Sequence, residues 1–230
     1  MITLAIDLAI IGIIVFCGWR GYKNGLIRGA FGFVALIAAL IIANIVAAAY
    51  SDEVSGALNP FVNGIVGSTL DKMIEQDDDE YEPIDHENES IEFKMAYTAL
   101  RRIGLPEPAA VNVTQQAVSD ESEGYLTDLV AEKLSSLLAY VALFGIAFLL
   151  LAIIFAVAGN LINFVFSLPG LKLIDIIAGA ALGIMKGFLI VLVIGSVVRY
   201  LGLLAVSTVE ETSVLKYFVN NNMIANMLGI

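Results

Sequence analysis

Among the charged side chains that lie inside the apolar stretches, three stand out as the residues best placed to do chemistry. Asp7 lies near the start of the first apolar run, while Asp175 and Lys186 lie in the last one. A charge within a membrane helix costs about 2.5–3.5 kcal/mol on insertion scales, so it marks pairing, anchoring at the interface, or a path for an ion or substrate. Asp175 and Lys186 would share a helix face but stand roughly 16 Å apart. Each therefore needs a partner elsewhere, and Arg20 or Arg28 could pair with Asp175.

Residue patterns typical of enzymes are missing from the sequence. His86 is the only histidine and Cys17 the only cysteine. There is no His-Glu-x-x-His, no Gly-x-Ser-x-Gly and no P-loop. The run Asp77–Glu80 lacks the spacing of a calcium loop and is expected to be a solvated acidic linker. We therefore expect no catalytic residue, no metal site, no cofactor and no nucleic-acid binding.

The composition indicates a chain that uses the bilayer as its solvent. Of 230 residues, 59% are hydrophobic and 15% charged, and the mean hydropathy is +0.86, which leaves too little polar surface for a soluble domain of this length. Residues 51–135 hold 19 acidic and 5 basic residues, whereas the rest holds 4 acidic and 7 basic residues. One acidic segment is therefore inserted into an apolar, mildly basic body.

Four apolar runs predict an all-α polytopic membrane protein with about four transmembrane helices arranged as two hairpins. The last run is longer than one crossing requires. Its residues 171–186 are expected to lie at the interface or to pack inside the bundle, with the crossing nearer Gly187–Val206. The four runs are Ile2–Trp19, Gly29–Tyr50, Leu137–Gly159 and Leu171–Val206.

Basic residues orient these spans. Arg20, Lys23 and Arg28 crowd a connection of about ten residues, and the positive-inside rule places this connection in the cytoplasm together with Lys172. Both termini and residues 51–136 then lie outside. The predicted organisation is a first hairpin (1–50), an extracytoplasmic acidic helical cap (51–136), a second hairpin (137–206) and an outer tail (207–230).

Periodicity predicts three helices in the cap. Val54–Ile74 places apolar residues near a helical period. Phe93–Ile103 forms a short helix that Gly104 stops, and residues from about Val111 to Ser136 form a helix that continues into the third span. The charged stretch Glu75–Glu89 separates the first two and is expected to be mobile.

A short internal repeat links the two predicted hairpins. Residues 21–29 and 179–187 share the pattern Gly-x3-Gly, two apolar residues, a base and Gly, at an offset of 158. Glycines four residues apart share one helix face and let another backbone come close. The faces Gly21/Gly25/Gly29 and Gly179/Gly183/Gly187 therefore predict tight packing within the chain, with an interface between copies or a sliding surface as alternatives.

These features together resemble the bacterial colicin V production protein (CvpA) family, over residues 1–50 and about 137–215. The base that often follows the family's signature aspartate is Ile176 here, and the outer segment is longer than in compact members. The resemblance implies a multi-pass protein of the bacterial inner (cytoplasmic) membrane, needed for toxin (colicin V) production or export and linked to the cell envelope. It rests on Asp7, Arg20-Gly21-Tyr22-x-x-Gly25 with Arg28, Asn160, and Asp175-x3-Gly179-x3-Gly183-x2-Lys186-Gly187.

Two functional hypotheses remain. The favoured one is a non-enzymatic scaffold or accessory whose partners are the lipid bilayer, membrane or secretion-machinery proteins, and a second copy through the glycine faces. The alternative is a small transporter or channel that uses Asp175, Lys186, Asn160 and Asn163 near the cytoplasmic side. A polar cavity reaching into the bundle distinguishes the second hypothesis from the first.

Overall fold

The computed structural model describes residues 2–75, 90–119, 124–161 and 172–202, together with residues 212 and 214. This part of the chain is all-helical, as predicted, and contains no strand. The predictions for the acidic run 77–80, for His86 and for nearly all of the 207–230 tail lie outside the described residues. The five helices are α1 Ile2–Glu75, α2 Ile91–Ile103, α3 Glu107–Val118, α4 Leu126–Leu161 and α5 Lys172–Tyr200.

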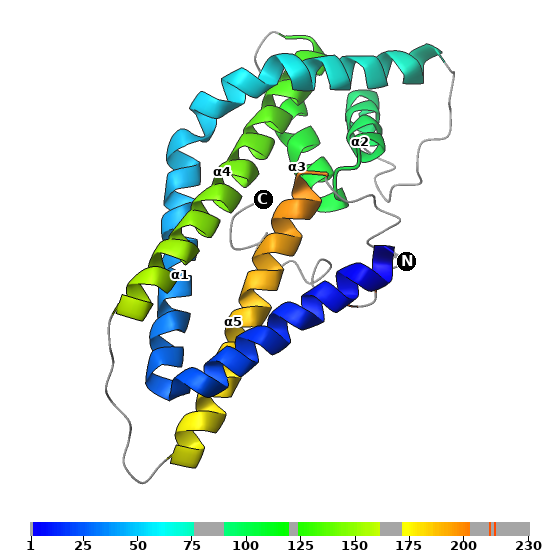
Figure 1. Ribbon diagram of the computed structural model, residues 1–230. Coiled ribbons are helices and arrows are strands. Elements are labelled where there is room, and N and C mark those ends of the chain that lie inside the picture. Colours follow the sequence, from blue (N-terminus) through cyan, green and yellow to red (C-terminus); the bar gives the residue numbers. More distant parts are fainter. Residues whose placement is uncertain are drawn as a thin grey trace.

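Helix α1 contains both of the first two predicted spans, and it turns a sharp corner at Gly25. The backbone there has φ 74° and ψ 178°, outside helical geometry, while the residues on both sides are helical. Only glycine adopts this conformation without a Cβ penalty. Residues 20–28 were predicted as a connecting loop, and this was wrong because one residue makes the turn. Figure 1 shows the first limb, residues 2–24, meeting the second limb, residues 26–75, at this corner.

Three helices, α1, α4 and α5, are long and apolar enough to cross a membrane. Their outward side chains are largely apolar, including Val34, Ile45, Ile153 and Ile177. A soluble protein rarely exposes so much contiguous apolar surface, whereas lipid is a suitable solvent for it. The helices thus fit a multi-pass membrane protein.

The spans pack around a core of small and aromatic residues. Ala39, Ala43 and Ala47 recur every four residues on the second limb of α1 and are fully buried, together with Phe144 and Phe148 of α4. Small residues at this spacing let neighbouring helices approach closely. Asn44, the one strongly polar residue of the predicted second span, accepts a hydrogen bond from the Tyr140 hydroxyl at 2.8 Å. Its polar group is therefore satisfied across the helix interface.

The far part of α1 turns across one end of the molecule and packs with α2, α3 and the start of α4 (Figure 1). Pro60, which lacks an amide proton, lies in this part. The Ser90 side chain caps α2 by accepting a hydrogen bond from the Phe93 amide at 3.2 Å, and Gly104 ends α2 in the left-handed conformation. The predicted α2 is thereby confirmed within two residues. The predicted helix Val111–Ser136 was wrong, because α3 ends at Val118 and α4 begins at Leu126.

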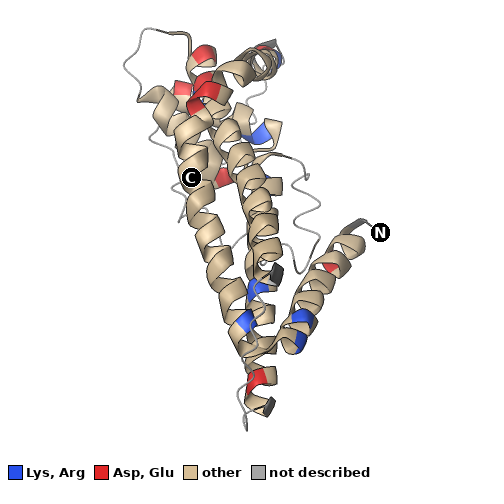
Figure 2. Ribbon diagram, turned by 60° about the vertical axis from the view of Figure 1, so that its left-hand side comes forward, with Lys and Arg blue, Asp and Glu red and all other residues tan. Residues whose placement is uncertain are grey.

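Most acidic side chains gather at this capped end, whereas basic ones occur in both halves of the molecule (Figure 2). The cap core includes Val66, Leu100 and Leu134, and Tyr200 at the end of α5 is buried in the same cluster. The capped end and the spans therefore share packed contacts at the ends of α4 and α5.

Candidate functional site

The corner at Gly25 is braced by Asp175. The Leu26 amide, the first of the second limb, donates a hydrogen bond to Asp175 Oδ1 at 2.8 Å. Because the helix restarts here, its first amides lack carbonyl partners within the helix, and a carboxylate at this end is favoured by the helix dipole. A Cβ at Gly25 would meet the same carboxylate, with Asp175 Cγ 3.0 Å away. Asp175 of α5 thus acts as an N-terminal cap for a different helix.

The ion pair expected between Asp175 and Arg20 or Arg28 is not found. Within the described ranges, neither arginine lies within ion-pair distance of a carboxylate, and Asp175 bonds a backbone amide instead. A carboxylate aimed at the start of a helix is satisfied without a cation. This partner could not be predicted from the sequence, because every residue except proline has a backbone amide and the residue type does not reveal which one Asp175 contacts.

The two glycine faces meet each other inside the chain, where the first limb of α1 crosses α5. A Cβ on Gly21 would lie 2.8 Å from Gly183 Cα, and one on Gly179 would lie 2.7 Å from the Gly25 carbonyl carbon. A Cβ on Gly187 would lie 3.0 Å from Ile14 Cα. Side chains at these positions would force the two backbones apart, so glycine is what permits the crossing.

The two copies of the repeat differ in local structure. Residues 21–29 contain the corner, whereas residues 179–187 lie within the continuous helix α5. The positive-φ glycines of the described chain include Gly25 but not Gly183, its counterpart in the repeat. The proposed equivalence of the two motifs therefore fails at this position. In the segment 171–186, for which a place at the interface or inside the bundle was predicted, Gly179 and Gly183 pack against the first limb of α1, whereas Leu173, Ile174 and Ile177 are exposed.

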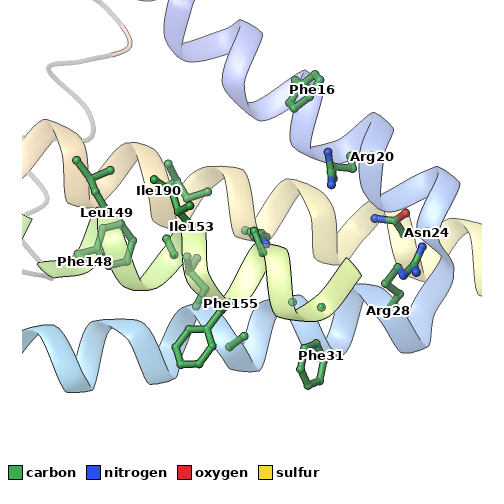
Figure 3. A pocket seen from close by; sticks show the side chains of 17 residues that line it. Phe16, Arg20, Asn24, Arg28, Phe31, Phe148, Leu149, Ile153, Phe155 and Ile190 are labelled. Atoms are coloured by element: carbon green, nitrogen blue, oxygen red, sulfur yellow. The ribbon is translucent and has the colours of Figure 1, made fainter. Parts of the chain in front are cut away.

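A cavity of about 380 Å³ lies between the limbs of α1 and helices α4 and α5. Arg20, Asn24 and Arg28 lie at one end, and Phe148, Leu149 and Ile153 line the other (Figure 3). Lys186 of α5 also lines it, and its Nζ is 3.3 Å from the position that a Cβ on Gly32 would occupy. The remaining lining residues are Phe16, Phe31, Gly32, Ala35, Leu36, Ala152, Phe155, Ala156, Gly159 and Ile190.

The basic groups of this cavity carry no counter-charge in the described part of the chain. No carboxylate lies within ion-pair distance of Arg20, Arg28 or Lys186 there, and all three line the same cavity. Like charges held in a partly apolar site repel one another unless an anion joins them. The arrangement can therefore bind a negatively charged group.

Some candidate residues lie away from the cavity. Asp7 Oδ1 accepts a hydrogen bond from the Val214 amide at 3.2 Å. Asp175 holds the corner, as described above. Asn160 lies in the last turn of α4, but its side chain is outside the described part, as is the whole of Asn163. Asn24 was not singled out from the sequence, although its four-residue spacing from Arg20 predicts a shared helix face.

One family model, described as "Colicin V production protein", matches residues 6–74 and 115–223. The match includes both glycine motifs, Asp175 and every basic residue of the cavity. It also extends into both ends of the cap, which had been expected to share nothing with the family, and leaves residues 75–114 unmatched. No curated protein and no solved structure matches the chain.

Proposed function

Because the chain belongs to the colicin V production protein family, we propose that it supports bacteriocin production or export and envelope processes from the bacterial cytoplasmic membrane. The proposed topology has four crossings, made by the two limbs of α1, by α4 and by α5. The first limb spans about 35 Å at 1.5 Å per residue, enough for a hydrocarbon core of about 30 Å. The corner at Gly25 and its basic neighbours then lie in the cytoplasm, and the cap lies outside.

The proposed molecular role is that of a non-enzymatic scaffold whose cap contacts other proteins. The observation that carries this role is the apolar surface on the cap. Phe61 is 74% exposed, Ile65 lies one turn further on the same face, and Tyr125 is 83% exposed. Exposed aromatic residues on a rigid, water-facing support are typical of protein contact sites. Secretion or envelope proteins of the membrane are the partners that the family suggests.

Site-specific photocrosslinking in native membranes tests this role. A crosslinking side chain at Phe61 or Ile65 is expected to trap defined protein partners. Gly56 is also exposed, but it faces another side of the same helix, so the same group there is expected to trap none. A protein that stays free of crosslinks at Phe61 and Ile65 would contradict the scaffold. A crosslink to a second copy of the chain would place a contact between copies on the cap and not on the glycine faces.

The cavity favours a second candidate function, a small transporter or channel for anions. Its basic end provides the polar cavity that this hypothesis requires, and Lys186 is the only α5 base among its lining residues. In proteoliposomes, the transporter hypothesis predicts an anion flux that Lys186→Ala abolishes. The absence of any flux from correctly inserted wild-type protein would exclude it.

A further inference from the structure

The cavity between the α1 limbs, α4 and α5 combines a basic surface and an apolar surface. Arg20 and Arg28 lie at one end with the Asn24 amide group beside them (Figure 3), and Lys186 lines the cavity next to Gly32, one helical turn along from Arg28. Arginine and lysine in one pocket suit a phosphate group, because guanidinium donates paired hydrogen bonds and ammonium adds charge. The volume of about 380 Å³ lies within the range of ligand-binding pockets.

The other wall of the cavity is apolar and comes mainly from α4. Phe148, Ala152, Ile153 and Ala156 line it. They offer no hydrogen bond from their side chains, so a small inorganic anion would leave this wall unused. An alkyl chain attached to the anion would pack against this wall and fill the apolar part of the cavity.

The mouth of the cavity opens among lipid-facing side chains. Phe16 of the first limb and Leu149 and Ile153 of α4 line the cavity, and each is about half exposed or more, at 54%, 49% and 60%. In the proposed topology these side chains lie at the depth of the hydrocarbon. A ligand would therefore enter from the bilayer.

We propose that this cavity binds one anionic phospholipid of the surrounding membrane. Arg20, Arg28 and Lys186 hold its phosphate, and an acyl chain lies along the α4 wall. Basic pockets between transmembrane helices on the cytoplasmic side are suited to anionic head groups. The inference rests on the membrane topology proposed above, but not on the role in toxin production or on the partners of the cap.

Lipid retention by the purified full-length chain tests this inference. The protein is reconstituted in nanodiscs of phosphatidylglycerol and phosphatidylcholine and then released from them. Native mass spectrometry measures the mass of the protein with the lipids that it retains. We expect about one phosphatidylglycerol per chain to be retained in preference to phosphatidylcholine. The double variant Arg28→Gln/Lys186→Gln is expected to bind phosphatidylglycerol at least tenfold more weakly, because two charge-assisted contacts are lost.

Lys23→Gln is the matched charge control. Lys23 belongs to the same basic segment but is exposed, and its Nζ lies over the Trp19 ring at 4.0 Å, away from the cavity lining. The wall is tested separately by Ala152→Phe, which fills the cavity without changing charge. Its control is Val157→Phe, an exposed α4 position outside the lining. Ala152→Phe is expected to lower retention, and neither control should change it.

Three outcomes would overturn the inference. The first is equal retention of phosphatidylglycerol and phosphatidylcholine by the wild type. The second is an equal loss in Lys23→Gln and in the double variant, which would indicate general surface charge. The third is displacement of the lipid by millimolar inorganic phosphate alone, which would assign the basic end to a soluble anion. Cysteine labelling of topology, run on the same variants, shows separately whether the proposed membrane placement has failed.

Discussion

At the scale of single residues, Gly25 and Asp175 form one unit. The glycine takes a backbone conformation that disfavours other residues, and the carboxylate occupies the space that a side chain would need. Their distance along the chain hid this relation from sequence analysis. The sequence identified both residues as candidates, but it assigned Gly25 to a packing face and Asp175 to an ion pair. The positive φ of Gly25 and its contact with Asp175 both depend on how α1 and α5 pack, which the sequence does not show.

Gly25→Ala is expected to destabilise the protein. A non-glycine residue held in this region costs about 1–3 kcal/mol from the backbone alone, and the methyl group also displaces Asp175. The midpoint of thermal unfolding in detergent should fall. Gly12→Ala is the control, because Gly12 is helical with open space around the added Cβ, and it should leave the midpoint unchanged or raise it. Equal midpoints for the two variants would show that the corner is not strained.

Asp175→Asn and Asp175→Ala separate capping from ion pairing. An asparagine oxygen can still accept from the Leu26 amide, whereas alanine removes the acceptor. We expect Asp175→Ala to lower the free energy of unfolding by about 0.5–2 kcal/mol and Asp175→Asn by clearly less. Denaturant unfolding of the purified chain measures both. Losses of similar size in the two variants would favour the ion pair with Arg20 or Arg28 after all.

At the scale of helices, the predictions succeeded where the signal was local. Ser90 and Gly104 bracket α2 with capping residues, and the predicted apolar runs fall on the three helices that are long and apolar enough to cross a membrane. The prediction of a loop at residues 20–28 was wrong because it rested on clustered charge. Lysine and arginine are also good helix formers, so clustered charge does not exclude a helix. The border between α3 and α4 was missed, although the polar run Ser119-Asp120-Glu121-Ser122-Glu123-Gly124 marks it in the sequence.

The crossing of α1 and α5 offers a direct test through the native cysteine. A Cβ at Gly187 would lie 3.0 Å from Cys17 Cβ, and disulfides require about 3.5–4.5 Å, which a small shift supplies. Gly187→Cys is therefore expected to form an intrachain disulfide with Cys17 under mild oxidation, detected by peptide mass mapping. Met185→Cys, exposed on another face of α5, should stay reduced. Crosslinked dimers through Gly187→Cys would instead place the glycine faces between copies.

At the scale of the whole molecule, the proposed membrane topology can be tested by labelling cysteines introduced at two positions, one in the cap and one in the basic segment. In a Cys17→Ser background, a cysteine at the exposed Ser68 of the cap should react with an impermeant maleimide on intact cells. A cysteine at Lys23 should react only after the membrane is opened. Labelling of Lys23→Cys on intact cells would reverse the orientation and move the basic segment outside.

The cavity is the part of the candidate site that could not be predicted from the sequence. Arg20, Arg28 and Lys186 were each singled out as charges in or near apolar runs, but they come from two helices far apart in the chain. Only the corner at Gly25 and the glycine crossing bring them to the lining of one cavity. Its α4 wall carries no signal of its own, because its residues are those of any lipid-facing helix.

The single-residue corner also makes the first limb of α1 a lever. That limb is about 35 Å long, so a rotation of about 10° at Gly25 moves its far end by roughly 6 Å. The cavity lies in the angle that this lever subtends with the second limb. Asp175 does not line the cavity. Its carboxylate nevertheless accepts a hydrogen bond from the Leu26 amide and so braces the corner at Gly25, about which the first limb would rotate. One carboxylate on α5 thereby braces the angle between the two limbs in which the cavity lies.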